Sequence, residues 1–351
     1  MSVTALSPAR PGTPSSVWLL LDSRQPGGIE SHVATLARAL VARGVAAEVV
    51  FLADHGAHPL KAALDGAGIA HTTLAGTMAS LFAALRQRRP AIVHTHGYKA
   101  GVLGRLMARL LGLPVVSSFH AGEPGFGRMR LYVATDYLTA RFAHCIAVSD
   151  AIRERLPQGS ALIENFVELP AAPAAAAGPR PETVAFVGRL SHEKGPDTFC
   201  SLAAAFPHLR FCIYGDGPMR RTLEAAHAHH VRFAGMVAGM AEHWQDVGLL
   251  CMPSRHEGLP MAALEAMAYG VPVAAFAVGA LPRCIAHERT GWLVPPGDVP
   301  AMAAAIAAWQ AMDDTAVRAA ARAAVAAAFS PAIGVDKVLA VYARAIGASP
   351  A

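Results

Sequence analysis

Short apolar runs alternate with longer amphipathic segments along most of this 351-residue chain. The runs are rich in Val, Ile, Leu and Phe without polar interruption, which is typical of strands that are buried on both faces. The segments between them carry apolar residues at helical spacing. This alternation predicts parallel sheets covered by helices on both faces, an α/β fold.

The same order of elements occurs twice. In the first half we expect strands at residues 17–22, 47–52, 91–95, 114–120 and 144–148, with helices at 29–43 and 100–111. The pattern restarts with strands at 183–188, 210–214, 231–234, 248–252, 271–276 and 292–294, with a helix at 197–206. Residues 169–181 are almost entirely Ala, Pro and Gly, which is typical of a linker. Residues 315–346 are Ala-rich with helical spacing and could pack on either half.

The sequence therefore predicts two Rossmann-like, doubly wound domains that face a cleft, with the first at residues 1–168 and the second at 169–335. Ligands of such sheets bind at the carboxyl ends of the strands, so we expect the active site there.

Composition excludes several classes of protein. Apolar residues make up 54% and charged residues 16%, as in a well-buried globular protein. Aromatic residues are only 7%, too few to indicate a base-stacking nucleic-acid platform. The five cysteines form no C-x-x-C pair, which favours a reducing, cytoplasmic compartment. No apolar run reaches the ~18 residues of a membrane span, and residues 1–16 lack the apolar core of a signal peptide.

The net charge of +5 is concentrated in the first half. Residues 1–165 carry 16 Lys and Arg against 10 Asp and Glu, whereas the remainder carries 14 against 15. A basic domain indicates an anionic partner, either a membrane surface or an acidic acceptor, and an arginine-rich solvated face is the bland alternative. We expect a cytoplasmic protein, with peripheral contact at the inner face of a membrane left open.

Two glutamates eight positions apart, Glu257 and Glu265, flank a predicted turn into a helix. Pro260 has φ fixed near the helical value and no N–H to lose, so we expect it at the first helical position. The N–H groups around Gly258 and Leu259 would then point out of the helix N-terminus, where an anionic group binds well. The segment predicts two acceptors for sugar hydroxyls beside a phosphate cradle, and a solvated helix face is the alternative.

Two further loops carry residues suited to phosphate. Gly27 and Gly28 follow the first strand, where glycine lets a ligand approach the backbone closely. The spacing is not G-x-G-x-x-G and no acidic residue ends the second strand, so a dinucleotide fingerprint is lacking. Arg189 and Lys194 follow the first strand of the second half, where two cations can clamp a diphosphate. A tight turn and a salt-bridged surface loop are the alternatives.

Histidines cluster at two neighbouring strand ends. His120 closes the fourth predicted strand and could hydrogen-bond a sugar hydroxyl or move a proton near neutral pH. Residues 121–127, which carry three glycines, could close over a substrate. For His94 and His96 a structural role is favoured. No spacing resembles H-E-x-x-H, so no metal site is expected.

Taken together, these residues resemble the retaining glycosyltransferases of family 4, the group 1 transferases of the GT-B fold. The resemblance covers residues 17–298 and rests on four segments in order. These are Gly27-Gly28 with Glu30, residues 92–99 leading to 118–120, Gly188-Arg189 with Lys194-Gly195, and the E-x7-E pair Glu257 and Glu265.

The resemblance implies a set of site residues. The catalytic residues would be His120, Glu257, Arg189 and Lys194. The donor would contact Gly27, Gly28, Arg189, Lys194, Glu257, Gly258, Leu259, Pro260 and Glu265. The acceptor would contact Glu30, His96, Tyr98 and Lys99. Within these sets, Arg189 and Lys194 would grip the diphosphate and Glu265 the ribose.

The resemblance also implies an activity. The first domain would hold the acceptor and the second a nucleotide diphosphate sugar, and a helix at about residues 336–351 would pack back on the first domain. A hexose or N-acetylhexosamine would pass from a UDP- or GDP-sugar to a glycan, lipid-linked or small-molecule acceptor, in envelope polysaccharide or glycolipid synthesis. Transfer would retain the anomeric configuration by a front-face mechanism, with no cofactor, divalent metal or nucleic acid.

Two segments depart from the family pattern. Residues 279–283, Gly-Ala-Leu-Pro-Arg, stand where many relatives have a glycine pair and a following glutamate, and residues 164–166, Glu-Asn-Phe, replace Pro-Asn-Gly. Three other functions stay open. The E-x7-E arrangement disfavours a nucleotide-sugar 2-epimerase. The set of polar site residues disfavours a non-catalytic sugar-nucleotide binding protein, and the glycine pattern disfavours a dehydrogenase.

Overall fold

The computed structural model describes residues 13–24, 27–120, 129–170, 181–237 and 239–347. The chain divides into two compact units, one made of Met1–Phe166 with Pro331–Ala351 and the other of Val167–Ser330. The boundary between the units lies two residues before the predicted one at 168. The predicted closing loop at 121–127 and residues 171–180 of the predicted linker lie outside the described residues.

The first unit is built on a seven-stranded parallel sheet with the order β3-β2-β1-β4-β5-β6-β7. Its strands are β1 (Ser16–Leu21), β2 (Ala46–Phe51), β3 (Ala70–Thr73), β4 (Ile92–His96), β5 (Val115–Phe119), β6 (His144–Ala147) and β7 (Ala161–Leu162). The strand order reverses between β1 and β4, and ligands of such sheets bind outside the carboxyl ends of the strands at that point.

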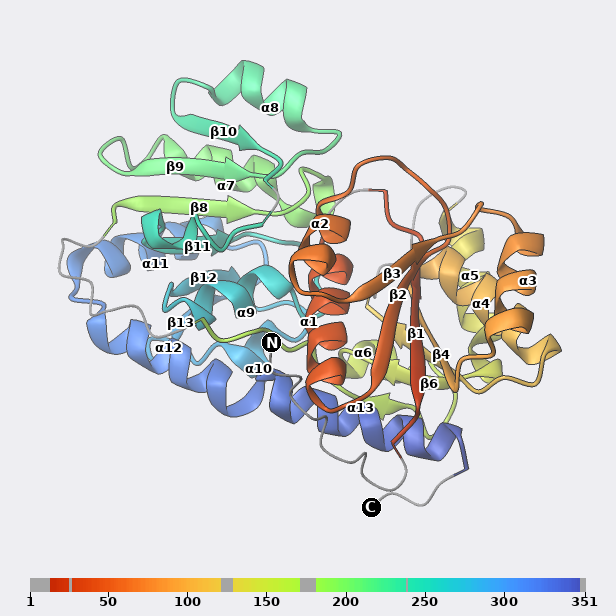
Figure 1. The fold of residues 1–351 in the computed structure, drawn as a ribbon. Coiled ribbons are helices and arrows are strands. Elements are labelled where there is room, and N and C mark those ends of the chain that lie inside the picture. The colour runs from red at the N-terminus through yellow and green to blue at the C-terminus, as the bar shows by residue number, and fades with distance from the viewer. Residues whose placement is uncertain (1–12, 25–26, 121–128, 171–180, 238, 348–351) are drawn as a thin grey trace. The chain divides into compact units, whose positions relative to one another are not determined.

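Helices cover both faces of this sheet (Figure 1). They are α1 (Gly28–Ala42), α2 (Pro59–Gly66), α3 (Met78–Arg88), α4 (Tyr98–Leu110), α5 (Met129–Thr139), α6 (Asp150–Arg153), α13 (Pro331–Ala345) and the 3-10 turn η1 (Ala140–Phe142). Successive side chains of β1 alternate between faces. Val17, Leu19 and Leu21 pack in the core under α1 and α13, whereas Trp18 and Leu20 pack in the core under α3 and α4.

The second unit repeats the design with a six-stranded parallel sheet in the order β10-β9-β8-β11-β12-β13. Its strands are β8 (Thr183–Val187), β9 (Arg210–Tyr214), β10 (Val231–Gly235), β11 (Leu249–Met252), β12 (Val273–Phe276) and β13 (Gly291–Val294). Here the strand order reverses between β8 and β11. Adjacent residues of β8 again pack on opposite faces of the sheet. Ala185 packs in one hydrophobic core, and Val184 and Phe186 pack in the other.

The helices of the second unit follow the same rule. They are α7 (Pro196–Ala203), α8 (Arg220–His227), α9 (Met261–Ala268), α10 (Leu281–Cys284), α11 (Val299–Ala311), α12 (Thr315–Ala328) and the 3-10 turns η2 (His192–Lys194) and η3 (Trp244–Asp246). Residues of α9, α10 and α12 pack in the core that contains Ala185, and residues of α7 and α11 pack in the one that contains Val184. The predicted fold, two doubly wound parallel sheets, is confirmed.

The predicted elements differ from the observed ones in identifiable places. Pro260 was expected at the first helical position, but it is the N-cap of α9, with φ −72° and ψ 126°, and the helix begins at Met261. The short strand β3 was missed because its sequence, Ala-His-Thr-Thr, belongs to a partly exposed edge with no apolar run.

Residues 315–346, expected as one helical segment, form two helices, because Phe329 and Ser330 separate α12 from α13 and Pro331 begins the second helix. One stretch, Thr315–Ala345, is long and apolar enough to cross a membrane, with a mean hydropathy of 1.6 over an 18-residue window. The expectation that no such stretch exists was therefore wrong, because alanines rather than a run of large apolar residues supply the hydropathy. The core helix of a soluble protein passes the same test, and α12 and α13 supply buried residues to the cores of the two units.

In the first unit, α13 makes a close contact with the segment that follows β7, and this contact helps to position a side chain at the carboxyl edge of the sheet. A Cβ atom on Gly334 would lie 2.0 Å from the Phe166 ring, so only glycine admits that ring. The Phe166 ring in turn lies edge-on against His32 of α1, with 5.1 Å between ring centroids. Gly334 thereby helps to fix a histidine at the carboxyl edge of the sheet.

We expect Gly334→Ala to destabilise the protein although alanine is the better helix former by ~1 kcal/mol. The added methyl overpacks the Phe166 contact, a change that costs about 1–3 kcal/mol. Urea unfolding measures the difference. Gly66→Ala is the matched control, since a Cβ there meets no atom within 4 Å and its substitution should be neutral or mildly stabilising. A Gly334→Ala variant as stable as Gly66→Ala would contradict the close approach.

Candidate active site

The loops that follow β8 and β11 meet at the point where the second sheet reverses its strand order. Lys194, after β8, donates from Nζ to Glu257 Oε2 at 2.7 Å. Ser254, after β11, donates from Oγ to Glu257 Oε1 at 2.8 Å. The Glu257 side chain is only 3% exposed, against 26% for Lys194. The carboxylate is therefore held from both oxygens, and it orients a cation that solvent still reaches.

Further contacts join the same two loops. Arg255 donates to both carboxylate oxygens of Asp197 at 2.9 and 2.6 Å, a bidentate pair, and also to the His192 carbonyl at 2.7 Å. A Cβ on Gly195, which has φ +69°, would lie 2.1 Å from the Pro253 carbonyl oxygen. Only glycine fits there, so the loop that carries Lys194 and the loop that carries Glu257 move as one piece.

The segment that departs from the family pattern braces this site from a third loop. Gly279 has φ +58°, and a Cβ there would lie 2.3 Å from the Glu257 carbonyl oxygen. The Ala280 N–H donates to the Gly258 carbonyl at 2.8 Å. These contacts hold the backbone of Glu257 and Gly258, so the loop between β12 and α10 supports the turn into α9.

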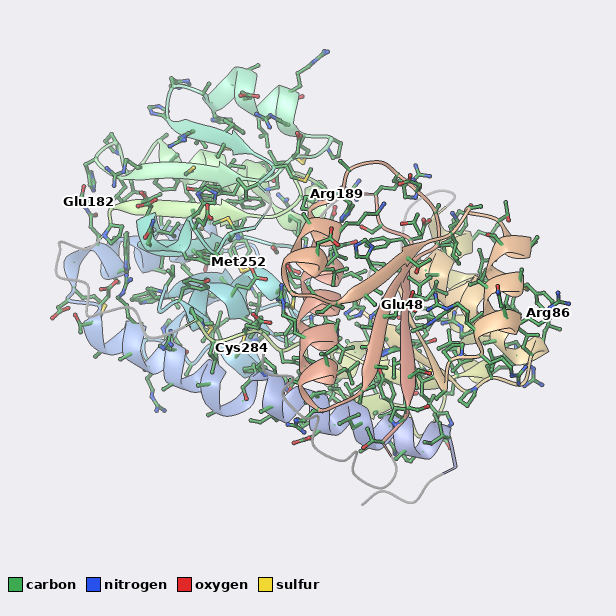
Figure 2. The ribbon with its side chains drawn as sticks, in the orientation of Figure 1. Glu48, Arg86, Glu182, Arg189, Met252 and Cys284 are labelled. Atoms are coloured by element: carbon green, nitrogen blue, oxygen red, sulfur yellow. The ribbon has the colours of Figure 1, made fainter. Side chains whose placement is uncertain are left out.

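The remaining predicted donor residues, apart from Gly27 and Gly28 of the first unit, lie on the same edge of the second sheet. Leu259 is buried, Pro260 is half-buried at the start of α9, and Glu265 is half-buried within that helix. Arg189 is exposed beyond the end of β8 (Figure 2). Burial raises the pKa of the Glu193 carboxyl, but a hydrogen bond from Ser191 and the nearby positive charges outweigh it, so the pKa lies below its ordinary value.

In the first unit the corresponding edge, after β1 and β4, holds the predicted acceptor residues. Gly27 and Gly28 are exposed where α1 begins, and Glu30 is half-buried in its first turn. Tyr98 begins α4. Lys99, the next residue, lies 2.9 Å from a carboxylate oxygen of Asp22, whose other oxygen accepts from His55 at 2.9 Å. Lys99 is therefore held by an ion pair in the structure.

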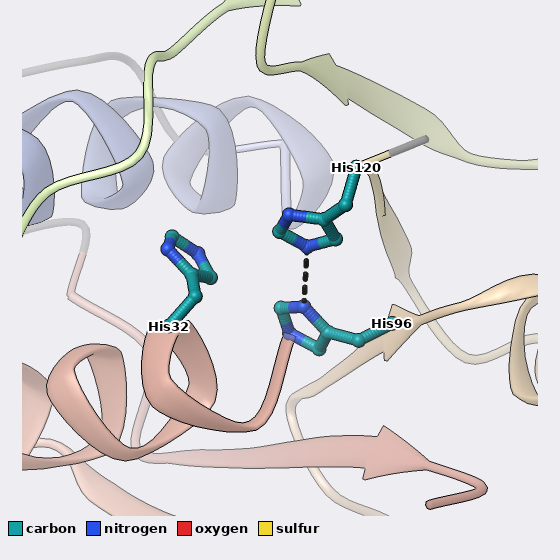
Figure 3. Close-up of side chains that lie close together, drawn as sticks. All are labelled: His32, His96 and His120. Carbon is teal, nitrogen blue, oxygen red and sulfur yellow. Dashed lines mark hydrogen bonds between the residues drawn. The ribbon is translucent and has the colours of Figure 1, made fainter. Parts of the chain in front are cut away.

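Four histidine rings lie beside these residues, and three of them make side-chain hydrogen bonds that the sequence could not show. His94 contacts the Tyr342 hydroxyl through Nδ1 at 2.7 Å and the Ser118 hydroxyl through Nε2 at 2.8 Å. His96 Nδ1 lies 3.2 Å from His120 Nε2 (Figure 3). The structural role favoured for His94 agrees with this geometry, because both of its nitrogens are engaged within the core.

The fourth ring, His32 of α1, was not identified from the sequence. Its ring lies edge-on to His120, with 4.9 Å between centroids. The available signal was its position one turn after the Gly27-Gly28 pair, on the helix that starts at the strand-order reversal. His32, His96 and His120 come from three separate elements, so no sequence spacing could indicate that they meet.

Burial keeps these rings uncharged. It lowers the pKa of His94 to about 3 and that of His120 to about 4, although a side-chain hydrogen bond between His120 and Asn165 raises the pKa of His120. Burial, together with the neighbouring imidazoles, also lowers the pKa of His32 and His96 well below the ordinary value. His120 is therefore neutral at pH 7 and suited to hydrogen bonding rather than to protonation and deprotonation near neutral pH.

Comparison with known proteins agrees with this arrangement. The model described as "Glycosyltransferase Family 4" matches residues 26–169, and that described as "Glycosyl transferases group 1" matches residues 181–311. The chain is 30% identical over 287 residues to a 2-deoxystreptamine N-acetyl-D-glucosaminyltransferase of Streptomyces fradiae, covering 69% of this chain and 68% of the relative. It is also 30% identical over 342 residues to a glycogen synthase of Mycobacterium tuberculosis, covering 80% and 81%.

Solved structures share the fold. Anabaena Alr3699/HepE in complex with UDP-glucose matches with a TM-score of 0.78 at 20% identity, covering 92% of this chain and 98% of that one. Sucrose-phosphate synthase of Thermosynechococcus elongatus matches with a TM-score of 0.75 at 20% identity, covering 95% and 100%.

The uncharged state of His94 predicts a specific loss of stability in acid. In the unfolded chain a histidine binds a proton with a pKa near ~6.5, whereas in the fold the pKa of His94 is about 3. The stability that neutral His94 contributes is therefore fully present above the unfolded pKa and is lost as the pH falls through the folded one. His94→Gln should reduce the slope of unfolding free energy against pH by about one proton, or about 1.4 kcal/mol per pH unit.

Urea unfolding between about pH 4.5 and 6.5 measures that slope, within the window where the unfolded chain binds the proton and the fold does not. Ser118→Ala is the control, because it removes one hydrogen bond of His94 without removing a titratable group. An unchanged slope in His94→Gln would show that His94 is protonated in the fold.

Proposed function

This chain belongs to the glycosyltransferases of family 4, group 1, which use nucleotide-sugar donors, and we propose that it transfers a hexose or N-acetylhexosamine from a UDP- or GDP-sugar to an acceptor hydroxyl. The product keeps the anomeric configuration, and the transfer needs no divalent metal. The acceptor belongs to envelope polysaccharide or glycolipid synthesis. A solved structure of the same fold contains UDP-glucose, which supports a UDP-sugar as the first donor to test.

The ion pair of Lys194 and Glu257 is the observation that carries this proposal. A nearly buried carboxylate holds the ammonium group at the strand-order reversal, where ligands of doubly wound sheets bind. One Lys194 proton is used by Glu257, and an ammonium group has three, so others are available to a diphosphate. In this reading Glu257 acts by orienting Lys194.

The groups around this pair suit the rest of a nucleotide diphosphate sugar. Arg189 is exposed at the end of β8 and adds a second cation for the diphosphate. The N–H groups of Gly258 and Leu259 precede α9, whose N-terminal end favours an anion. Glu265, one turn inside α9, supplies a carboxylate for the ribose hydroxyls. Cations that grip the diphosphate also stabilise the charge that develops as it leaves.

The first unit supplies the acceptor side. His96 and His120 are uncharged, so they hydrogen-bond a sugar hydroxyl as neutral donors or acceptors. Glu30, Tyr98 and Lys99 lie at the same edge of the sheet and offer further polar contacts. Burial lowers the pKa of His96 and His120, so both imidazoles are weak bases. In the proposed front-face mechanism the leaving phosphate takes the proton of the acceptor hydroxyl.

We expect Glu265→Ala to weaken binding of the preferred nucleotide sugar about 10- to 100-fold, since hydrogen bonds to a charged group contribute about 1.5–3 kcal/mol. Calorimetry with UDP-, GDP- and ADP-sugars measures the affinity. Glu224→Ala, which removes a partly exposed carboxylate from α8, is the control and should leave the affinity unchanged. The double variant Arg189→Ala with Lys194→Ala should lower turnover by about 100-fold, the loss expected when developing charge is no longer stabilised.

Two results would count against these assignments. Equal affinity in Glu265→Ala and Glu224→Ala would remove Glu265 from the ribose, and an unaltered rate in the double variant would remove the diphosphate clamp. The transferase assignment as a whole is tested by NMR of the donor after incubation with the protein and without acceptor. An epimerised nucleotide sugar there would replace the transferase by a 2-epimerase.

The protein is also proposed to work at the inner face of a membrane. Three large side chains of α5, Leu131, Tyr132 and Leu138, are 73%, 56% and 60% exposed. Arg130 and Arg141 are exposed beside them, which suits an anionic lipid surface. The side of α5 away from Leu131 and Leu138 is anchored by a buried ion pair, Arg105 with Asp136 at 2.5 Å.

Leu131→Glu with Leu138→Glu should lower the affinity for vesicles that contain phosphatidylglycerol about tenfold or more, because each change removes an apolar side chain that would be buried in the interface. Vesicle co-sedimentation measures the loss. Met78→Glu is the control, since Met78 is 57% exposed on α3, away from α5. Equal binding by the double variant and the control would reject α5 as the membrane surface.

A further inference from the structure

Three histidine rings of the first unit gather at the strand-order reversal, and the hydrogen bond between two of them, His96 and His120, does not involve His32. His32 lies on α1, His96 ends β4, and His120 follows β5 (Figure 3). One ring nitrogen from each lies within 4.8 Å of the others. The arrangement is compact enough for all three to contact one small ion.

Two nitrogens of this group are buried without a partner among the described residues. These are His32 Nδ1, on a residue that is 4% exposed, and His96 Nε2, on a residue that is 1% exposed. The other nitrogen of His96, Nδ1, is the one that faces His120. An unsatisfied buried polar group is unfavourable, so such groups are rare and call for an explanation. His94, the fourth ring, offers no such nitrogen because Tyr342 and Ser118 engage both of its nitrogens.

The distances fit a tetrahedral metal centre. Nitrogen ligands at ~2.0–2.1 Å from Zn²⁺ stand about 3.3 Å from one another in a tetrahedron. His96 Nδ1 and His120 Nε2 are already 3.2 Å apart. One ring nitrogen of His32 lies within 4.8 Å of a nitrogen of each of the other two rings, so a small approach of the rings would complete the set of three ligands. Three protein ligands leave a fourth position for water or a hydroxyl group.

The ligand chemistry selects the metal. Each of the three imidazoles has one ring nitrogen with a lone pair in its neutral form, and that is the form that binds a metal. Neutral imidazole suits Zn²⁺, Co²⁺, Ni²⁺ and Cu²⁺, whereas Mg²⁺ and Ca²⁺ require oxygen ligands. The cluster is made of histidines alone.

We propose that His32, His96 and His120 form a binding site for Zn²⁺ or a similar late first-row divalent cation. The site has a consequence for the reaction, and this second step rests on the proposed function. A bound metal takes the lone pairs of His96 and His120, the two imidazoles assigned to the acceptor. Zn²⁺ therefore inhibits glycosyl transfer, and removal of Zn²⁺ restores it.

Titration with Co²⁺ tests the site directly, because tetrahedral Co²⁺ absorbs in the visible region and reports its own coordination. The full chain should bind one Co²⁺, and Zn²⁺ should displace it. His32→Phe and His32→Gln should each bind at least 100-fold more weakly. The control is His229→Ala with His230→Ala, which removes a pair of adjacent exposed imidazoles whose ring centroids lie 4.2 Å apart and should leave the affinity unchanged.

A measurement on the wild-type protein does not depend on any variant folding. Zn²⁺ should shift the NMR resonances of the His32, His96 and His120 rings together and leave those of His229 and His230 unchanged. The proposal is overturned if wild-type protein shows no visible Co²⁺ band, or if both His32 variants bind as tightly as wild type. Loss of Co²⁺ binding in the variant that lacks His229 and His230 would overturn it as well.

The inhibition is measured as the ratio of transfer rates with and without Zn²⁺, within each variant. The ratio should fall at least tenfold in wild type, recover when a chelator is added, and stay near one in His32→Phe. Metal binding without inhibition would refute the second step and the assignment of His120 to the acceptor, while the metal site itself would stand.

Discussion

Parallel pairing on both sides of one central strand is the constraint on which each unit depends. β1 pairs with β2 on one side and β4 on the other, and β8 pairs with β9 and β11 in the same way. Because the chain builds outward in one direction and then restarts on the other side, its crossovers run over opposite faces and separate at the central strand. The loops that leave this point carry Lys194 and Glu257 in the second unit, and His96 ends β4 at this point in the first unit.

The two units use this position for opposite electrostatic purposes. In the second unit a nearly buried carboxylate is compensated by Lys194 and Ser254, so charge is retained and directed toward a ligand. In the first unit burial removes charge instead, since it lowers the pKa of His94 and His120 far below the ordinary value. A charged diphosphate suits the charged site of the second unit, and a neutral hydroxyl suits the uncharged histidines of the first unit.

The sequence predicts the strands of both sheets well because their apolar runs are local signals, and it singles out Lys194 and Glu257 because each follows such a run. Their direct contact could not be predicted, since 63 positions separate them and the pairing depends on sheet order. The same reason hides the meeting of His32 with His96 and His120. The boundary between α12 and α13 was missed although Pro331 marks it, because the alanine-rich spacing continues on both sides.

Residues 279–283 show how a departure from a family pattern can preserve a site. Ala280 stands where many relatives have the second glycine of the pair. Gly279 nevertheless keeps φ +58° and the close approach to the Glu257 carbonyl that no other residue allows. The hydrogen bond from Ala280 to Gly258 uses the backbone, so alanine makes it as well as glycine would. The backbone that holds Glu257 is unchanged, so the departure at residues 279–283 can alter only the side chains that face the donor sugar. We therefore expect the departure to affect which sugar is accepted, and we expect the diphosphate contacts to be common to the family.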